Sequence, residues 1–248
     1  MLFFAFLSAL SVSAETKVLV VGDSHTVGDF GDALVSKLKT QPDFRVALSA
    51  SCGSSPTHWL GTPYRNAICS SELDYNERSP KKNLQPGSHP MPSFQALVQE
   101  KKPDTVVIAL GGNQMPKDPK ASLTGARKDV ARMIQAAKVN GAKCIWISPP
   151  ARVDSIYPRE IQDRFTAMLV EVTREQGCAF VNSRNHTNAK DTVNDPFRVH
   201  YYRYPGKNGR NPGGEWGSGV GAEVITSIRV NGPTGSQSST PSSAASGN

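Results

Sequence analysis

The stretch VLVVGDSHTVGDFGDALVSKL, residues 18–38, decides the fold of this chain. A run of apolar residues ends at GDSH, residues 22–25, and a helical pattern of apolar residues follows it. Small, polar and reactive residues therefore stand where a buried strand becomes a helix. Such a turn suits two functions. Its backbone amides can hold a phosphate at the start of the helix, or it can present Ser24 as a nucleophile above the end of a sheet.

Short apolar runs rich in Val and Ile predict buried strands at residues 17–21, 45–49, 105–110, 143–147 and 179–182. Their apolar residues are continuous rather than alternating, which is typical of parallel strands covered on both faces. Helical patterns lie between them, at residues 27–38, 94–101, 123–139 and 157–176. Strands that alternate with helices predict an α/β fold with a doubly wound sheet between two helical layers.

Three clusters of small and polar residues directly follow predicted strands. They are GDSH at 22–25, SCGS at 51–54 and GGNQ at 111–114. In doubly wound sheets, ligands bind outside the carboxyl ends of the strands. We therefore expect these three clusters, distant in the sequence, to form one site.

The phosphate interpretation lacks its motif. A dinucleotide turn needs G-x-G-x-x-G and a P-loop needs its Lys-Ser/Thr pair, and the turn at 22–25 has neither. The segment GSGVGA at 217–222 is rich in glycine, but no predicted strand precedes it. The nucleophile interpretation is therefore favoured over nucleotide binding.

The parts of a serine esterase are present. Ser24 at a helix start gains from the helix dipole, and its own amide can face a developing oxyanion. Gly53 has no side chain to obstruct a second amide, and Asn113 can supply a third N–H donor. His200 follows the last predicted strand and is the candidate general base.

The same blocks resemble a known family. GDSHT at 22–26, the isolated Gly53, GGN at 111–113 and VHYY…GGEW at 199–216 are similar, in order and spacing, to the SGNH/GDSL hydrolases. The resemblance spans about residues 17–216. It implies a flavodoxin-like α/β/α sandwich with a five-stranded parallel sheet, and ester hydrolysis with no metal or other cofactor.

In that family Ser24 corresponds to the catalytic nucleophile and His200 to the base. The Ser24 amide, the Gly53 amide and the Asn113 side chain correspond to the oxyanion hole. The histidine after the serine in GDSHT is most similar to members that remove O-acetyl groups from peptidoglycan or other polysaccharides. An O-acetylated glycan is therefore the expected substrate and peptidoglycan the favoured one. The alternatives are a lipase or thioesterase acting on longer acyl esters, and a glycan-binding protein with weakened turnover.

The catalytic acid departs from the family pattern. Members usually carry it three residues before the histidine, where this chain has Phe197. Asp195 lies five residues before His200 and is the favoured acid. Two alternatives stay open: Asp191 serves instead, or a carbonyl orients His200 in a Ser-His dyad.

Further residues are expected to border the cleft: Asp23, His25, Gly111 and Tyr201. Asp23 is expected to hydrogen-bond neighbouring loops rather than to transfer protons. His25 is interpreted either as part of the cleft wall or as a solvated residue at the helix start. The histidines show no metal-ligand spacing.

The two ends of the chain differ from residues 15–230, which we expect to form one catalytic domain. Residues 2–12 are almost wholly apolar and small residues follow, so residues 1–14 are interpreted as a signal peptide, too short to span a bilayer. Residues 231–248 are rich in Ser, Gly and Pro and are expected to be disordered. A secreted or periplasmic protein follows from this interpretation.

The four cysteines are consistent with export, because disulfides persist in oxidising compartments. Cys52 and Cys69 bracket an irregular segment, where a disulfide could contribute about 3 kcal/mol by closing the loop. Cys144 and Cys178 lie in apolar, strand-like runs and are expected to be free buried thiols.

The net charge of +7 comes from scattered Lys and Arg residues. No zinc-finger spacing or basic helix gathers them, so nucleic acid is not an expected partner. An exported basic protein more simply meets an anionic surface such as a cell-wall polymer. Stable membrane insertion is not expected, and the protein is expected to be a monomer.

Overall fold

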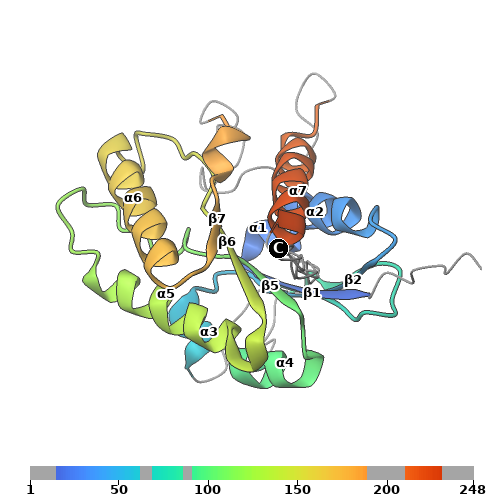
Figure 1. The fold of residues 1–248 in the computed structure, drawn as a ribbon. Coiled ribbons are helices and arrows are strands. Elements are labelled where there is room, and N and C mark those ends of the chain that lie inside the picture. Colours follow the sequence, from blue (N-terminus) through green and yellow to red (C-terminus); the bar gives the residue numbers. More distant parts are fainter. Residues whose placement is uncertain (1–14, 62–68, 86–90, 189–209, 231–248) are drawn as a thin grey trace, which may run out of the picture.

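The computed structural model describes residues 15–61, 69–85, 91–188 and 210–230 (Figure 1). Within these residues, seven strands form one sheet between two layers of helices. The strands are β1 (Thr16–Gly22), β2 (Phe44–Ser51), β3 (Ser70–Leu73), β4 (Lys81–Asn83), β5 (Thr105–Ala109), β6 (Lys143–Ile147) and β7 (Ala179–Val181). The helices are α1 (Ser24–Val27), α2 (Asp29–Lys39), α3 (Pro56–Leu60), α4 (Phe94–Lys101), α5 (Thr124–Ala137), α6 (Arg159–Glu175) and α7 (Pro212–Val230), with 3-10 turns η1 (Val139–Gly141) and η2 (Ser183–Asn185).

The strand order is β4-β3-β2-β1-β5-β6-β7. The five strands predicted from apolar runs, β2, β1, β5, β6 and β7, are all parallel to their neighbours in this part of the sheet. This is the flavodoxin-like order, and it reverses direction between β1 and β5. The expected count of five strands was wrong, because β3 and β4 add two antiparallel strands at the β2 edge.

Alternate residues of the central strands face two separate cores. In β1, Val18 and Val20 pack on the side of α2 and α7, whereas Leu19 and Val21 pack on the side of α3 to α6. Figure 1 shows α1, α2 and α7 over one face of the sheet and α3, α4, α5 and α6 over the other. Because both faces are covered, these strands show no polar alternation in the sequence.

Helix α7 was not predicted, and it contains the GSGVGA segment at 217–222. Glycine disfavours a helix by about 1 kcal/mol per residue relative to alanine. Here the glycines allow close packing, since a Cβ at Gly217 would lie 2.3 Å from the Phe30 carbonyl oxygen of α2. Packing on α2 thus outweighs the poor intrinsic propensity.

Two disulfides are present in the described residues. The predicted Cys52–Cys69 bond is confirmed. The expectation of free thiols at Cys144 and Cys178 was wrong, because these residues also form a disulfide. The parallel register of β6 and β7 brings the Cα atoms of Cys144 and Cys178 to 4.7 Å from one another, a separation typical of disulfides.

The proposed signal peptide, residues 1–14, and the proposed tail, residues 231–248, lie outside the described residues. Among the helices that the structure describes, none is both long enough and apolar enough to cross a membrane.

Candidate active site

The three polar clusters meet at one edge of the sheet, as predicted. Gly22, at the end of β1, pairs in register with Ala50 of β2 on one side and with Ala109 of β5 on the other. All three strands therefore end at the same level, and each is followed by its cluster. The site lies where the strand order reverses, between β1 and β5.

Ser24 begins the short helix α1 directly after β1. Asp23 caps this helix, since its Oδ1 accepts a hydrogen bond of 3.0 Å from the backbone N–H of His25. Ser24 is 7% exposed, so its surroundings are largely free of bulk water. The turn is compact because Gly22 has no side chain: a Cβ there would lie 1.9 Å from Thr26 Oγ1.

Gly53 and Asn113 are both exposed at this edge. Gly53 has φ of 75°, in the left-handed region that glycine tolerates best. The Asn113 side chain donates from Nδ2 to the Ser54 carbonyl oxygen at 2.8 Å. This bond ties the β5 cluster to the β2 cluster and uses one of the two Nδ2 hydrogens. The other hydrogen is available for an oxyanion.

Ser54 connects all three clusters, and the sequence analysis assigned it no role. Its carbonyl oxygen accepts from Asn113, and its Oγ lies 2.7 Å from the Ser51 carbonyl oxygen and 3.3 Å from the Gly22 carbonyl oxygen. The indole Nε1 of Trp59 donates to the same Oγ at 3.2 Å. Ser54 is fully buried. Ser54 therefore links the two oxyanion-hole candidates Gly53 and Asn113, since it follows Gly53 in the chain and accepts a hydrogen bond from Asn113.

His25 is buried rather than solvated. Its Nδ1 lies 3.2 Å from Asp23 Oδ1, and its ring meets the edge of Trp216 at a centroid separation of 5.4 Å. Trp216 is stacked on Phe30 of α2 at 3.8 Å. The interpretation of His25 as a solvated helix-start residue is therefore wrong, and His25 helps to wall the small cavity behind the Ser24 turn.

The sequence matches the model of one known protein family. Residues 20–202, most of the chain, match the sequence model of the GDSL-like lipase/acylhydrolase family. The chain belongs to this family. The match includes all four blocks on which the resemblance to SGNH/GDSL hydrolases rests, apart from the GGEW end of the last one.

Solved structures of similar fold include an esterase, a lipase/acylhydrolase and a carbohydrate acetylesterase. The esterase EstA from Pseudoalteromonas sp. is 13% identical with a TM-score of 0.56, and the match covers 88% of this chain and 100% of EstA. The lipase/acylhydrolase from Enterococcus faecalis is 14% identical with a TM-score of 0.54, covering 87% and 96%. Est24, a carbohydrate acetylesterase from Sinorhizobium meliloti, is 13% identical with a TM-score of 0.54, covering 86% and 99%. At these identities the likeness shows the fold. A search of curated proteins found no match.

Of the remaining predicted residues of this GDSL-family site, one lies within the described residues and the others lie outside them. Gly111 is buried two residues after the end of β5, and a Cβ there would lie 3.2 Å from the Phe165 ring of α6. The predicted base, acid and cleft residue of the last block lie outside the described residues, as does the alternative acid: His200, Asp195, Tyr201 and Asp191. Their roles stay predictions.

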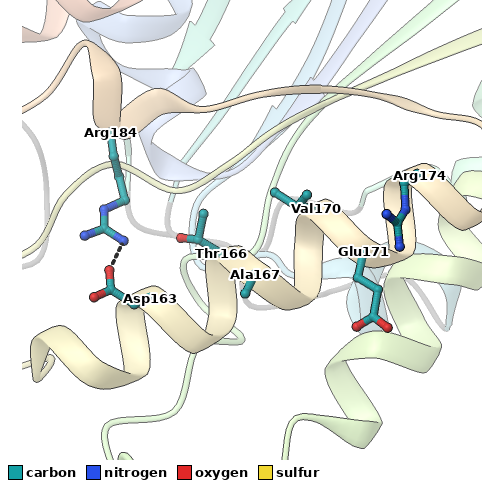
Figure 2. A pocket seen from close by; sticks show the side chains of 7 residues that line it. All are labelled: Asp163, Thr166, Ala167, Val170, Glu171, Arg174 and Arg184. Carbon is teal, nitrogen blue, oxygen red and sulfur yellow. Dashed lines mark hydrogen bonds and ion pairs between the residues drawn. The ribbon is translucent and has the colours of Figure 1, made fainter.

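One hollow in the described part of this GDSL-family protein lies away from the site. It has a volume of about 390 Å³ and lies along the outer face of α6, between Asp163 and Arg174 (Figure 2). Figure 2 shows the Arg184–Asp163 ion pair among the side chains that line this hollow. Within the described residues, no group of three His, Cys, Asp or Glu side chains is arranged to hold a metal ion.

Proposed function

We propose that this protein is an exported serine esterase that removes O-acetyl groups from a cell-wall or extracellular glycan, with peptidoglycan favoured. The observation that carries the proposal is the meeting of Ser24, Gly53 and Asn113 at the sheet edge, linked through Ser54. Membership of the GDSL-like family and the carbohydrate acetylesterase among proteins of similar fold support the reaction class. The two disulfides support export, since such bonds persist in oxidising compartments.

The proposed reaction has two steps. Ser24 Oγ attacks the acetyl carbonyl carbon while His200 takes the hydroxyl proton. The oxyanion receives hydrogen bonds from the Ser24 and Gly53 amides and from Asn113 Nδ2. The carbon–oxygen bond to the sugar then breaks, and His200 returns the proton to the leaving sugar hydroxyl. Water, deprotonated by His200, attacks the acetyl-enzyme. The bond from the acetyl carbon to Ser24 Oγ then breaks, His200 returns the proton to Oγ, and acetate is released.

The first test is hydrolysis of p-nitrophenyl acetate by the purified protein. Ser24→Ala should lower kcat by several orders of magnitude, because the nucleophile is lost. A Ser24→Ala variant that keeps full activity contradicts the proposed nucleophile. Thr166→Ala, on the distant face of α6, is the matched hydroxyl control and should behave like the wild type.

A second experiment identifies the substrate. Rates on p-nitrophenyl esters of increasing chain length should be greatest for acetate. A rate that peaks at octanoate or longer rejects the acetylesterase in favour of the lipase or thioesterase alternative. Acetate release from O-acetylated peptidoglycan should exceed release from O-acetylated xylan. Binding of the glycan without any hydrolysis would identify the third alternative, a binding protein.

A further inference from the structure

Arg152 is an unusual residue to find beside this site, because charged side chains are rarely buried without a close partner. It follows β6 in the loop that leads to α6, and it is 3% exposed. Among the residues that the structure describes, none forms a hydrogen bond with its Nε. The sequence analysis gave this arginine no role, and the proposed mechanism does not use it.

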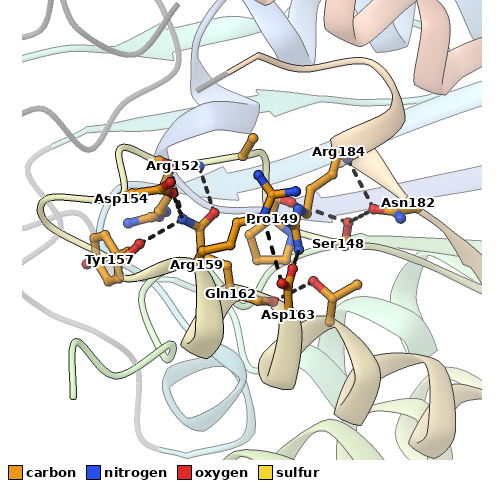
Figure 3. A network of polar contacts seen from close by, with 12 residues as sticks. Ser148, Pro149, Arg152, Asp154, Tyr157, Arg159, Gln162, Asp163, Asn182 and Arg184 are labelled. Atoms are coloured by element: carbon orange, nitrogen blue, oxygen red, sulfur yellow. Dashed lines mark hydrogen bonds and ion pairs between the residues drawn. The ribbon is translucent and has the colours of Figure 1, made fainter. Parts of the chain in front are cut away.

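The loop around Arg152 is held by a second buried polar residue, Gln162 of α6 (Figure 3). Its Oε1 accepts from the Arg152 backbone N–H at 2.9 Å, and its Nε2 donates to the Arg152 carbonyl oxygen at 3.0 Å. The same Nε2 lies 2.7 Å from the Tyr157 carbonyl oxygen. The guanidinium carbon lies 4.6 Å from the centre of the Tyr157 ring, in a cation–π contact. The guanidinium is therefore fixed in place.

The guanidinium faces the nucleophile turn across Gly112. A Cβ at Gly112 would lie 2.4 Å from Arg152 Nη2 and 3.7 Å from Asp23 Oδ2, so both charged groups approach the same point. They are near one another without direct ion-pair contact. Burial lowers the pKa of the Arg152 guanidinium, and its interactions with Tyr157 and Asp23 oppose that shift. In a buried environment, opposite charges at such a separation still attract strongly.

The two oxygens of Asp23 thus have different neighbours. Oδ1 caps α1 by accepting from His25 N–H, and Oδ2 is on the side of Arg152. We propose that Arg152 is a positioning residue for the nucleophile: its buried positive charge keeps the Asp23 side chain seated as the cap of the turn that carries Ser24. This inference rests on the proposed role of Ser24.

Loss of the positive charge would leave the buried Asp23 carboxylate with His25 as its remaining side-chain partner among the described residues, which is less favourable. The Asp23 side chain would then move toward water, and the cap on α1 would weaken. The Ser24 hydroxyl would leave its attacking geometry. The expected effect is on kcat rather than on KM, since Arg152 does not touch the substrate in this proposal.

The test compares Arg152→Met, which keeps the length of the side chain, with Arg152→Lys, which keeps the charge. On p-nitrophenyl acetate, we expect Arg152→Met to lower kcat by about tenfold or more with KM changed less than about twofold. Arg152→Lys should recover most of that loss. Arg159→Met is the control, because Arg159 is exposed and its Nε lies 3.7 Å from Asp163 Oδ2, in an ion pair on the surface of α6. Wild-type kcat in Arg152→Met, or equal losses in the Met and Lys variants, overturns the inference.

A double-mutant cycle tests whether Arg152 acts through Asp23. Asn at position 23 can still cap the helix but carries no charge. In the Asp23→Asn background, Arg152→Met should change kcat by less than about threefold. The same loss in both backgrounds shows that Arg152 does not act through Asp23. If Arg152→Met alone does not fold, the double variant buries neither charge and is compared with Asp23→Asn in the same way.

The proposed function and this inference fail differently. If the Ser24→Ala variant stays active, Ser24 is not the nucleophile, and the proposed function is rejected. An inactive Ser24→Ala variant together with a fully active Arg152→Met variant leaves the function intact and rejects only the positioning role.

Discussion

The two disulfides should differ in what their loss does to catalysis, although both should stabilise the fold. The double variants Cys52→Ala/Cys69→Ala and Cys144→Ala/Cys178→Ala remove one bond each. The bonds close loops with sequence separations of 17 and 34 residues. Constraint of the unfolded chain then contributes about 3 kcal/mol for the first bond and about 4 kcal/mol for the second.

Their positions relative to the site are opposite. Cys52 immediately precedes Gly53, and its N–H donates to the Cys69 carbonyl oxygen at 2.9 Å, so this bond anchors the loop that offers the Gly53 amide. Cys144 lies near the start of β6, and Cys178 directly precedes β7. The second bond is therefore at the amino-terminal edge of the sheet, away from the candidate active site.

We expect both double variants to lose stability and only the first to lose kcat. In a domain of this size, about 3 kcal/mol corresponds to a fall in Tm of about 6–12 °C. Urea unfolding gives the free energy of unfolding, and hydrolysis of p-nitrophenyl acetate at a temperature where each variant is folded gives kcat. An unchanged kcat in Cys52→Ala/Cys69→Ala would refute the reasoning about the Gly53 loop. A stability loss below about 1 kcal/mol in both variants would refute the loop-closure argument.

Three further predictions concern single residues. Asn113→Ala should lower kcat by about 10²–10³ with little change in KM, because the removed N–H donor serves the transition state; a loss confined to KM would contradict this. Asp195→Asn should cost orders of magnitude in kcat if Asp195 orients His200, and a kcat within about twofold of wild type would favour Asp191 or a Ser-His dyad. His58 should make the fold sensitive to acid, because burial lowers its pKa and its Nδ1 accepts the Ser55 N–H at 3.1 Å. The unfolded chain then binds the proton more readily, so Tm should fall as pH drops below about 6.5, and His58→Asn should flatten that dependence.

The parallel strands and the site edge could be predicted because their signals are local. Each central strand is a short apolar run, and each polar cluster follows its run directly. The parallel order then brings the clusters together without further information. By contrast, β4 is three exposed polar residues, Lys81–Asn83, and only its pairing with β3 makes it a strand.

Other features depend on contacts between distant segments. The Cys144–Cys178 bond depends on the register between β6 and β7, which no pattern within either strand specifies. Helix α7 is stabilised by close approach to α2 at Gly217, while its composition alone argues against a helix. Tertiary packing decides both.

The candidate site shows the same division between exposed and buried residues. Two of the residues that sequence patterns reveal, Gly53 and Asn113, are exposed at the carboxyl-terminal edge of the sheet. The residues that hold the loops of the site in place are buried and polar, and their partners come from other elements. Ser54 contacts the clusters after β1 and β5, and Gln162 of α6 holds the Arg152 loop. A buried polar group is costly unless it is paired, so each of these residues is compatible only with this arrangement of the chain. A family motif therefore identifies the groups that react, whereas the geometry that makes them reactive is encoded in side chains outside the motif.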